Sequence, residues 1–335
     1  MRPRNLILRS TGLLIFFTFI IISCKKDDSS TPASSVPTYP VSATILNPVG
    51  QPQGGATLTL KNPPSNEAKF TAITDSSGRA TIQAPEGEQT LLAKMGSVFQ
   101  TEFNVTVAAS QSGTNAGTVT LQQNVALGRV LVIYADCEEL ETVLRSDSVG
   151  FTNFDTTTVY VMRARAATDS AATLTYLRTY SLVFSDCNCG DEDGYPLLAR
   201  IYGRYVQGGG KIYGGHYNYM NLQYIFPPYY QTPTSSSNDS ITVINANLSN
   251  ALGYTILRWP GSTGYEKWTD LPVGASTVYV VFTRTSGSSS SPQGVPVIVE
   301  NRLGTGKYLW TIYHNQDILT DPHLIKIVRF FLYSL

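Results

Sequence analysis

The chain has 335 residues, with 24 basic and 24 acidic side chains that give a formal net charge of zero, and only 14% of its residues are charged. This length allows two ordinary domains, each with its own core. A protein that neutralises nucleic-acid phosphates carries a basic excess, so the composition excludes nucleic acid as a partner. The abundance of Ser, Thr, Tyr and Gly suits a secreted or surface-exposed protein.

Residues 1–23 have the parts of a bacterial export signal. Three arginines precede residues 13–22, an apolar run too short for the roughly 20 residues that span a bilayer as a helix. The following Ile21-Ile22-Ser23-Cys24 resembles a lipobox, the motif of lipoprotein signal peptides. The resemblance implies cleavage before Cys24, acylation of that cysteine and attachment to a membrane. An ordinary secretory signal that ends near a cysteine is the alternative.

Residues 24–40 read as the lipidated cysteine and a linker rich in Ser, Thr and Pro, with almost nothing to bury. The charged run Lys25-Lys26-Asp27-Asp28 looks like the surface-export tags of some Gram-negative lipoproteins, or is simply a solvated start to the linker. We expect a cell-envelope location, lipid-anchored at the outer membrane, with the face of that membrane left open.

Residues 41–124 alternate in short period-two runs separated by Gly and Pro turns, which predicts a small antiparallel β-sandwich. We expect seven strands: 42–46, 56–60, 70–74, 79–82, 90–93, 99–107 and 118–121. The turn residues Gly54-Gly55, Thr74-Asp75 with Gly78, and Pro85 with Gly87 resemble those of carboxypeptidase regulatory-like domains. That family has a prealbumin-like sandwich, with a carbohydrate-binding-like fold, and usually serves as a spacer or a binding module.

Residues 125–335 have a different pattern, in which strands alternate with helices. Residues 129–134 form an apolar run typical of a strand buried on both faces. The pattern predicts a mostly parallel sheet with helices on both faces. Further strands are expected at 159–162, 181–184, 211–213, 278–282, 295–299 and 307–313, and helices at 138–145, 171–180, 197–206 and 323–333. Residues 229–270 fit no simple unit and are expected to form an irregular insertion.

Two motifs in this region resemble ThuA-like proteins of the class I glutamine amidotransferase-like superfamily. One runs from the helix end at Tyr205 through Gly208-Gly209-Gly210 to His216, and the other from Pro296 to His314-Asn315. The resemblance covers about 200 residues and implies a flavodoxin-like fold.

Reactive side chains follow the expected parallel strands, and ligands of open parallel sheets bind outside the carboxyl ends of their strands. Asp136, His216 and His314 are the candidate catalytic residues at this edge, although histidines there are often only structural. The candidate binding residues are Tyr217, Asn315, Trp259 and Trp268. The last two belong to an aromatic-rich insertion that could stack on a sugar ring or anchor a protein, or could simply cover the sheet.

The superfamily's nucleophilic cysteine is absent from the matching turn, Tyr213-Gly214-Gly215-His216-Tyr217, so glutamine hydrolysis by that mechanism is not expected. Beyond Cys24 the chain has three cysteines. Outside the cytoplasm thiols tend to pair, and the flavodoxin-like order implied by the resemblance brings Cys137 close to Cys187 or Cys189. A disulfide is therefore the preferred interpretation, with a Cys/His zinc site and a reactive third thiol as alternatives.

These observations together predict a non-catalytic lipoprotein, without cofactor or metal, whose α/β domain binds a glycan or a protein at the strand ends. The alternative is a ThuA-like enzyme that acts on a sugar derivative through His216 and His314. A purely structural envelope component is a third possibility.

Overall fold

In the computed structural model the chain divides into two compact units, residues 1–36 and 37–335. The structure describes residues 36–135, 139–186, 196–215, 218–226, 231–235, 240–258, 264–268, 276–283, 296–311 and 322–335. The predicted signal segment, Cys24 and the predicted linker up to residue 35 lie outside this part. No helix within it is long and apolar enough to cross a membrane.

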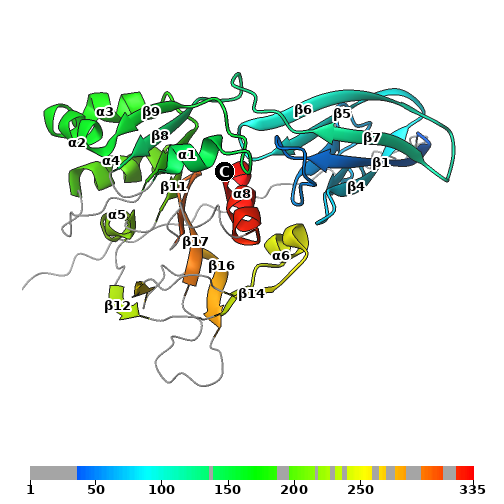
Figure 1. Cartoon of the computed structure of the whole chain (residues 1–335). Coiled ribbons are helices and arrows are strands. Elements are labelled where there is room, and N and C mark those ends of the chain that lie inside the picture. Colours follow the sequence, from blue (N-terminus) through cyan, green and yellow to red (C-terminus); the bar gives the residue numbers. More distant parts are fainter. Residues whose placement is uncertain are drawn as a thin grey trace, which may run out of the picture. The chain divides into compact units, whose positions relative to one another are not determined.

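The first described region is a β-sandwich built from all seven predicted strands (Figure 1). One sheet has the order β3-β2-β5-β6 and is antiparallel throughout; the other has the order β4-β1-β7. The strands are β1 (Thr38–Leu46), β2 (Thr57–Leu60), β3 (Thr71–Ile73), β4 (Arg79–Pro85), β5 (Gly87–Met95), β6 (Phe99–Val107) and β7 (Thr114–Thr120), and a 3₁₀ turn, η1 (Ala68–Phe70), precedes β3. The prediction of a wholly antiparallel sandwich is wrong in one pair, because β1 and β7 run parallel.

Alternation of the side chains builds the core of the sandwich. Along β1 the residues Val41, Ala43 and Ile45 are buried while their neighbours are only partly so, as period-two geometry requires. The turn between β3 and β4 needs Gly78, whose φ is +74° and whose added Cβ would lie 2.4 Å from the Ile45 carbonyl oxygen. This glycine therefore lets the turn close against β1.

The second region contains a nine-stranded mixed sheet in the order β14-β13-β16-β17-β18-β11-β10-β8-β9. Strands β18, β11, β10, β8 and β9 are parallel, and each pair from β18 to β14 is antiparallel. The strands are β8 (Val130–Tyr134), β9 (Asp155–Thr158), β10 (Leu182–Ser185), β11 (Lys211–Gly214), β13 (Ser240–Val243), β14 (Ile256–Arg258), β16 (Ser276–Thr283), β17 (Pro296–Leu303) and β18 (Gly306–Thr311).

The sheet is thus only half parallel, which corrects the prediction of a mostly parallel one. The reason lies in the short link between β17 and β18. Leu303 pairs with Gly306, so only Gly304 and Thr305 join the two strands, and a two-residue loop can connect only antiparallel neighbours. Gly304 has the positive φ, +62°, that such a tight turn requires.

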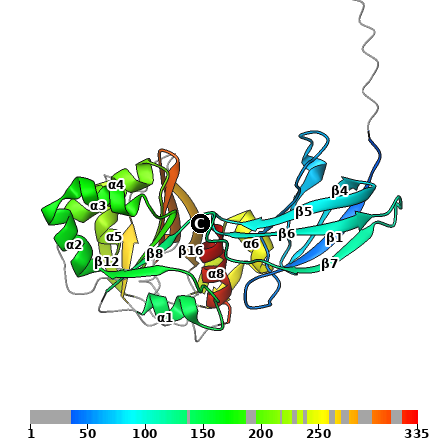
Figure 2. The ribbon, with the colours of Figure 1, turned by 90° about the horizontal axis from the view of Figure 1, so that it is seen from above.

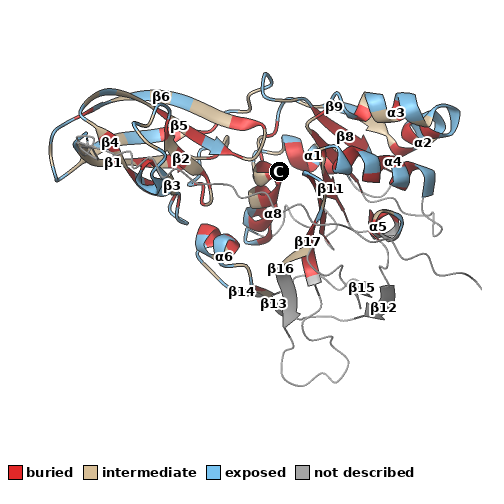
Figure 3. Cartoon of the chain, turned by 180° about the vertical axis from the view of Figure 1, so that it is seen from behind, coloured by how far each residue is buried: buried red, intermediate tan, exposed pale blue. Residues whose placement is uncertain are grey.

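Helices cover both faces of the parallel half, as predicted. Figure 2 shows α2, α3 and α4 on one side of β8 and α1 with α8 on the other. The helices are α1 (Leu140–Arg145), α2 (Val159–Thr168), α3 (Ser170–Leu177), α4 (Pro196–Gln207), α5 (Tyr219–Ile225), α6 (Ala246–Leu252) and α8 (Leu324–Ser334). Strands β8, β10 and β11 are mainly buried, and the outer faces of α2 to α4 are exposed (Figure 3).

Two expectations about this region were wrong. Residues 159–162, predicted as a strand, begin helix α2, because the Thr158 hydroxyl accepts the Val161 N–H and caps the helix there. Within 229–270, expected to be an irregular insertion, β13 and β14 extend the main sheet beyond β16, and β12 (Gln231–Ser235) pairs with β15 (Gly264–Trp268). Helix α6, capped by the Asn245 side chain, connects β13 to β14 in the chain.

Candidate functional site

The carboxyl ends of four parallel strands meet at one edge of the sheet. In register, Ile133 of β8 pairs with Ser185 of β10, Ser185 with Gly214 of β11, and Gly214 with Trp310 of β18. Neighbouring strands of a sheet lie roughly 4.8 Å apart, so these four strand ends lie side by side. We call this the carboxyl edge.

Most residues predicted to form the site follow these strands, whereas Trp259 follows β14 and Trp268 ends β15. Nearly all of them lie outside the described part of the chain. This holds for Asp136, Cys137, Cys187, Cys189, His216, Tyr217, Trp259, His314 and Asn315. Trp268 is the last residue of β15, and only its backbone is described. What the structure does describe is a buried polar layer at this edge, which we call the floor and which contains Ser185, Asn218, Asn221, Tyr202 and Tyr308.

The floor is held together by Asn218, the residue before α5. Its side-chain oxygen accepts the Ser185 hydroxyl at 3.0 Å, and its amide nitrogen donates to the Ser185 and Asp186 carbonyl oxygens at 2.9 and 2.6 Å. The Asn221 amide, one helical turn later, donates to the same Asn218 oxygen at 3.0 Å. Asn218 is 2% exposed, so these bonds join β10 to α5 in a dry environment where each matters for stability.

Gly214 makes this arrangement possible. A Cβ at this position would lie 2.8 Å from the Tyr308 ring and 3.0 Å from the Asn218 Cβ. Any larger residue would push β11 away from α5. The glycine at the strand end is therefore explained by close packing on the floor.

Two buried tyrosines complete the floor on the α4 and α5 side. Burial raises the pKa of Tyr202 and of Tyr308, opposed in each case by a smaller effect of a neighbouring polar side chain, Ser185 for Tyr202 and Asn221 for Tyr308. Neither hydroxyl has a hydrogen-bond partner in the described part of the chain. The floor therefore contains two buried hydroxyls that form no hydrogen bond with the described residues.

The Asp186 carboxylate points to the opposite side of β10. It is 2% exposed and accepts the Leu140 N–H, at the first residue of α1, at 3.3 Å. The contact connects the carboxyl edge to α1, and it gives this acid a structural role.

Sequence reasoning missed the floor, although a signal for it was present. Ser185 ends an otherwise apolar strand, and Asn218 and Asn221 stand one helical turn apart just after the next strand of the sheet. Polar residues at that spacing lie on one helix face. Among the described residues no three His, Cys, Asp or Glu side chains gather as metal ligands would.

Comparison with known proteins gave no match to a family model and none to a curated protein. Among solved structures, a ThuA-like protein of Bacteroides uniformis is 12% identical, with 62% of this chain and 90% of that chain covered and a TM-score of 0.44. A GMP synthase protein of Thermoplasma acidophilum is 12% identical, with 61% and 92% covered and a TM-score of 0.41. PurLQS of Thermotoga maritima is 13% identical, with 62% and 96% covered and a TM-score of 0.41.

Proposed function

We propose that this chain is a lipid-anchored protein of the cell envelope whose α/β region binds a glycan or a protein at the carboxyl edge and catalyses no reaction there. The sandwich, a carboxypeptidase regulatory-like domain in this proposal, is the spacer between the anchor and the binding region. The observation that carries the proposal is the alignment of four strand ends above a polar floor. Ligand sites of open sheets occupy this place.

The chemistry of the floor favours binding over catalysis. Ser185, Asn218 and Asn221 are neutral, and their polar atoms hold one another and the backbone. The buried Asp186 carboxylate accepts the Leu140 N–H at the start of α1, which supports a structural role for this acid. Acid–base catalysis needs a titratable group within reach of the substrate, and these three floor residues supply none.

A glycan array probed with the purified full chain tests the binding function. We expect saturable binding to a defined glycan class, weakened roughly tenfold by Tyr217→Ala, Trp259→Ala or Trp268→Ala, because stacked aromatic rings carry much of the affinity for such ligands. Tyr160→Ala, at an exposed tyrosine of α2, is the matched control and leaves binding unchanged. An absence of any ligand together with a measurable turnover would overturn the proposal.

The anchor has its own test. Metabolic labelling with a palmitate analogue should modify the wild-type chain, and Cys24→Ala should abolish both the label and recovery in the outer-membrane fraction, because acylation supplies the membrane affinity. Labelling of the Cys24→Ala variant would refute this part. Protease accessibility on intact cells then reports which face of the membrane carries the protein.

The second candidate function is catalysis on a sugar derivative through His216 and His314. One observation favours it: β11 and β18 are adjacent and parallel, with Gly214 paired to Trp310, so the two histidine-bearing segments leave from neighbouring strands. His216→Ala and His314→Ala would each abolish turnover of such a sugar, and His323→Ala, the remaining histidine, is the control. Wild-type behaviour of both variants eliminates this candidate.

A further inference from the structure

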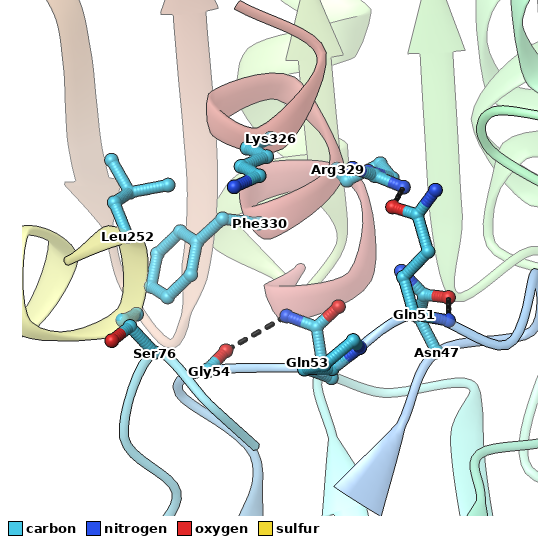
Figure 4. A pocket seen from close by; sticks show the side chains of 11 residues that line it. Asn47, Gln51, Gln53, Gly54, Ser76, Leu252, Lys326, Arg329 and Phe330 are labelled. Atoms are coloured by element: carbon cyan, nitrogen blue, oxygen red, sulfur yellow. Dashed lines mark hydrogen bonds between the residues drawn. The ribbon is translucent and has the colours of Figure 1, made fainter. Parts of the chain in front are cut away.

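A cavity that shares no residue with the carboxyl edge lies between the sandwich loops and the helices α6 and α8. Its volume is about 330 Å³, near the lower end of the roughly 300–1,000 Å³ typical of small-molecule sites. Figure 4 shows Lys326, Arg329 and Phe330 of α8 facing Gln51 and Gln53 of the loop after β1.

The unusual feature of this cavity is a buried cation for which the described residues supply no counter-ion. Arg329 is only 5% exposed, and its Nη1 donates to the Gln51 side-chain oxygen and, at 3.1 Å, to the Ser148 carbonyl oxygen. Both acceptors are neutral, and no described carboxylate pairs with this guanidinium. Desolvation by burial lowers the pKa of Arg329, the effect expected of an uncompensated buried charge.

A second cation lies one turn earlier on the same face of α8. Lys326 is exposed, lines the cavity and forms no ion pair with a described residue. Two cations and no acid among the lining residues make the cavity electropositive. The guanidinium fork still has Nη2 and Nε without a hydrogen-bond partner in the described part of the chain, and a carboxylate or phosphoryl group matches that geometry.

The neutral lining residues offer both donors and acceptors. The Gln53 amide nitrogen donates to the Gly54 carbonyl oxygen at 2.7 Å, which leaves its side-chain oxygen to accept. The Gln51 oxygen is used by Arg329, which leaves the Gln51 amide nitrogen to donate. A hydroxyl group both donates and accepts, so this pair suits a ligand with several hydroxyls.

The walls are fixed by close packing. A Cβ on Gly54 would lie 2.2 Å from the Ala251 carbonyl oxygen, and one on Gly55 would lie 2.5 Å from the Phe330 ring. These glycines let the loop lie directly on α6 and on the aromatic ring. Phe330 and Leu252 then form an apolar wall beside the polar groups, as the face of a sugar ring requires.

We propose that this cavity binds a hydroxylated organic anion of about the size of one sugar ring, with the anionic group on Arg329 and Lys326 and the hydroxyls on Gln51 and Gln53. The inference goes beyond the proposed function and does not depend on it. A free acidic sugar and a sugar phosphate share the required chemistry, and the probes below distinguish them.

Isothermal titration of the full chain with glucuronate, glucose 6-phosphate, glucose and inorganic phosphate tests the proposal. We expect saturable binding of at least one of the two anionic sugars and affinities at least tenfold weaker for glucose and for inorganic phosphate. Glucuronate alone identifies a carboxylate ligand, and glucose 6-phosphate alone a phosphorylated one. Failure of both anionic sugars to bind, or equal binding of glucose, overturns the proposal, and equal binding of inorganic phosphate overturns the role of the hydroxyls.

Variants separate the cavity from general charge effects. Lys326→Met should weaken anion binding roughly tenfold with unchanged thermal stability, because the side chain is exposed and makes no described ion pair. Lys94→Met, at an exposed lysine of β5 outside the cavity, is the matched control. Arg329→Gln should abolish binding, but it also removes the contacts to Gln51 and Ser148, so Lys326→Met is decisive. Equal effects of Lys326→Met and Lys94→Met would refute the site.

Discussion

The ring of Phe99 in β6 packs edge-on against the ring of Tyr333 in α8, with centroids 4.7 Å apart and an interplanar angle of 65°. Phe99 also contacts Phe151 at 5.0 Å, and Phe151 contacts Phe184 of β10 at 5.5 Å. All four rings are buried. They form one row that runs from the sandwich to the main sheet, so the two regions share a core.

Replacement of Phe99 should therefore destabilise both regions together. We expect Phe99→Ala to lower the free energy of unfolding by about 3–5 kcal/mol, the usual cost of a large cavity in a packed core. Urea unfolding, followed by intrinsic fluorescence and by far-ultraviolet circular dichroism, measures the change. The two signals should move to lower urea in a single coincident transition.

Ile73→Ala provides the control for this experiment, since Ile73 lies in the same sandwich and is 64% exposed. Its effect should stay within about 0.5 kcal/mol. Two separate transitions in the Phe99→Ala protein, with the α/β region at its wild-type midpoint, would contradict a shared core.

The sandwich was predictable strand by strand because its signals are local. Each turn is marked by Gly, Pro or Asp, and the side chains between turns alternate. The parallel pairing of β1 with β7 was not predictable in this way. It joins residues about 75 positions apart, such as Val41 and Thr114, and depends on how the two sheets close around their core.

The main sheet was predictable in its buried strands and not in its order. Apolar runs such as 130–134 are recognisable as buried strands in the sequence. The direction of β17 instead depends on the two-residue loop that joins it to β18. The strands β13 and β14 are short and mix polar with apolar residues, so their structure depends on the pairing of β13 with the apolar β16 and of β14 with β13.

The ends of the strands were predictable from the sequence, and the floor between them was not. A strand end is visible in a sequence, which is why the reactive residues could be assigned to the carboxyl edge as a hypothesis. The bonds of Asn218 to Ser185 and Asp186 connect residues more than thirty positions apart. Only the fold brings such residues together.

Two tyrosines of α4 should respond oppositely to removal of the hydroxyl. Tyr205 donates to the Tyr180 carbonyl oxygen at 3.0 Å, whereas the Tyr202 hydroxyl has no described partner. We expect Tyr205→Phe to cost about 1 kcal/mol and Tyr202→Phe to be neutral or slightly stabilising, since it removes an unpaired buried polar group. Urea unfolding measures both, and the pair is matched because both side chains are almost fully buried on one helix. A loss of about 1 kcal/mol in Tyr202→Phe would mean that its hydroxyl is paired.

Stability should fall in alkali. Burial raises the pKa of Tyr202, Tyr205 and Tyr333 above the value of about 10 of an unfolded chain. Above about pH 10 the unfolded state releases these protons while the folded state retains them. The folded state then binds more protons, so the free energy of unfolding decreases as pH rises.

The alkaline effect can be measured by urea unfolding at about pH 8 and about pH 10.5, with tyrosinate absorbance recorded in parallel. Exposed tyrosines should titrate first, and the buried ones only as the fold opens. Tyr202→Phe should lose less stability over the same interval, since it has one buried phenol fewer. Ionisation of all 20 tyrosines in one step before unfolding would contradict the prediction.

The cysteines that follow β8 and β10 should contain one disulfide. The two strands are adjacent, with Ile133 paired to Ser185, and Cys137 follows the first while Cys187 and Cys189 follow the second. We expect a bond from Cys137 to one of the other two, which contributes about 2–4 kcal/mol. Alkylation of the denatured, unreduced protein, followed by mass spectrometry, should therefore modify only one of these three thiols.

Single substitutions identify the partner by the thiols that they release. Cys137→Ser should leave both Cys187 and Cys189 alkylated. Of Cys187→Ser and Cys189→Ser, the variant that lacks the partner should leave two thiols, because Cys137 is freed, and the other should leave none. Three reactive thiols in the wild-type protein, purified without reductant, would rule out the bond, because a structural disulfide outside the cytoplasm resists reduction and would persist through purification.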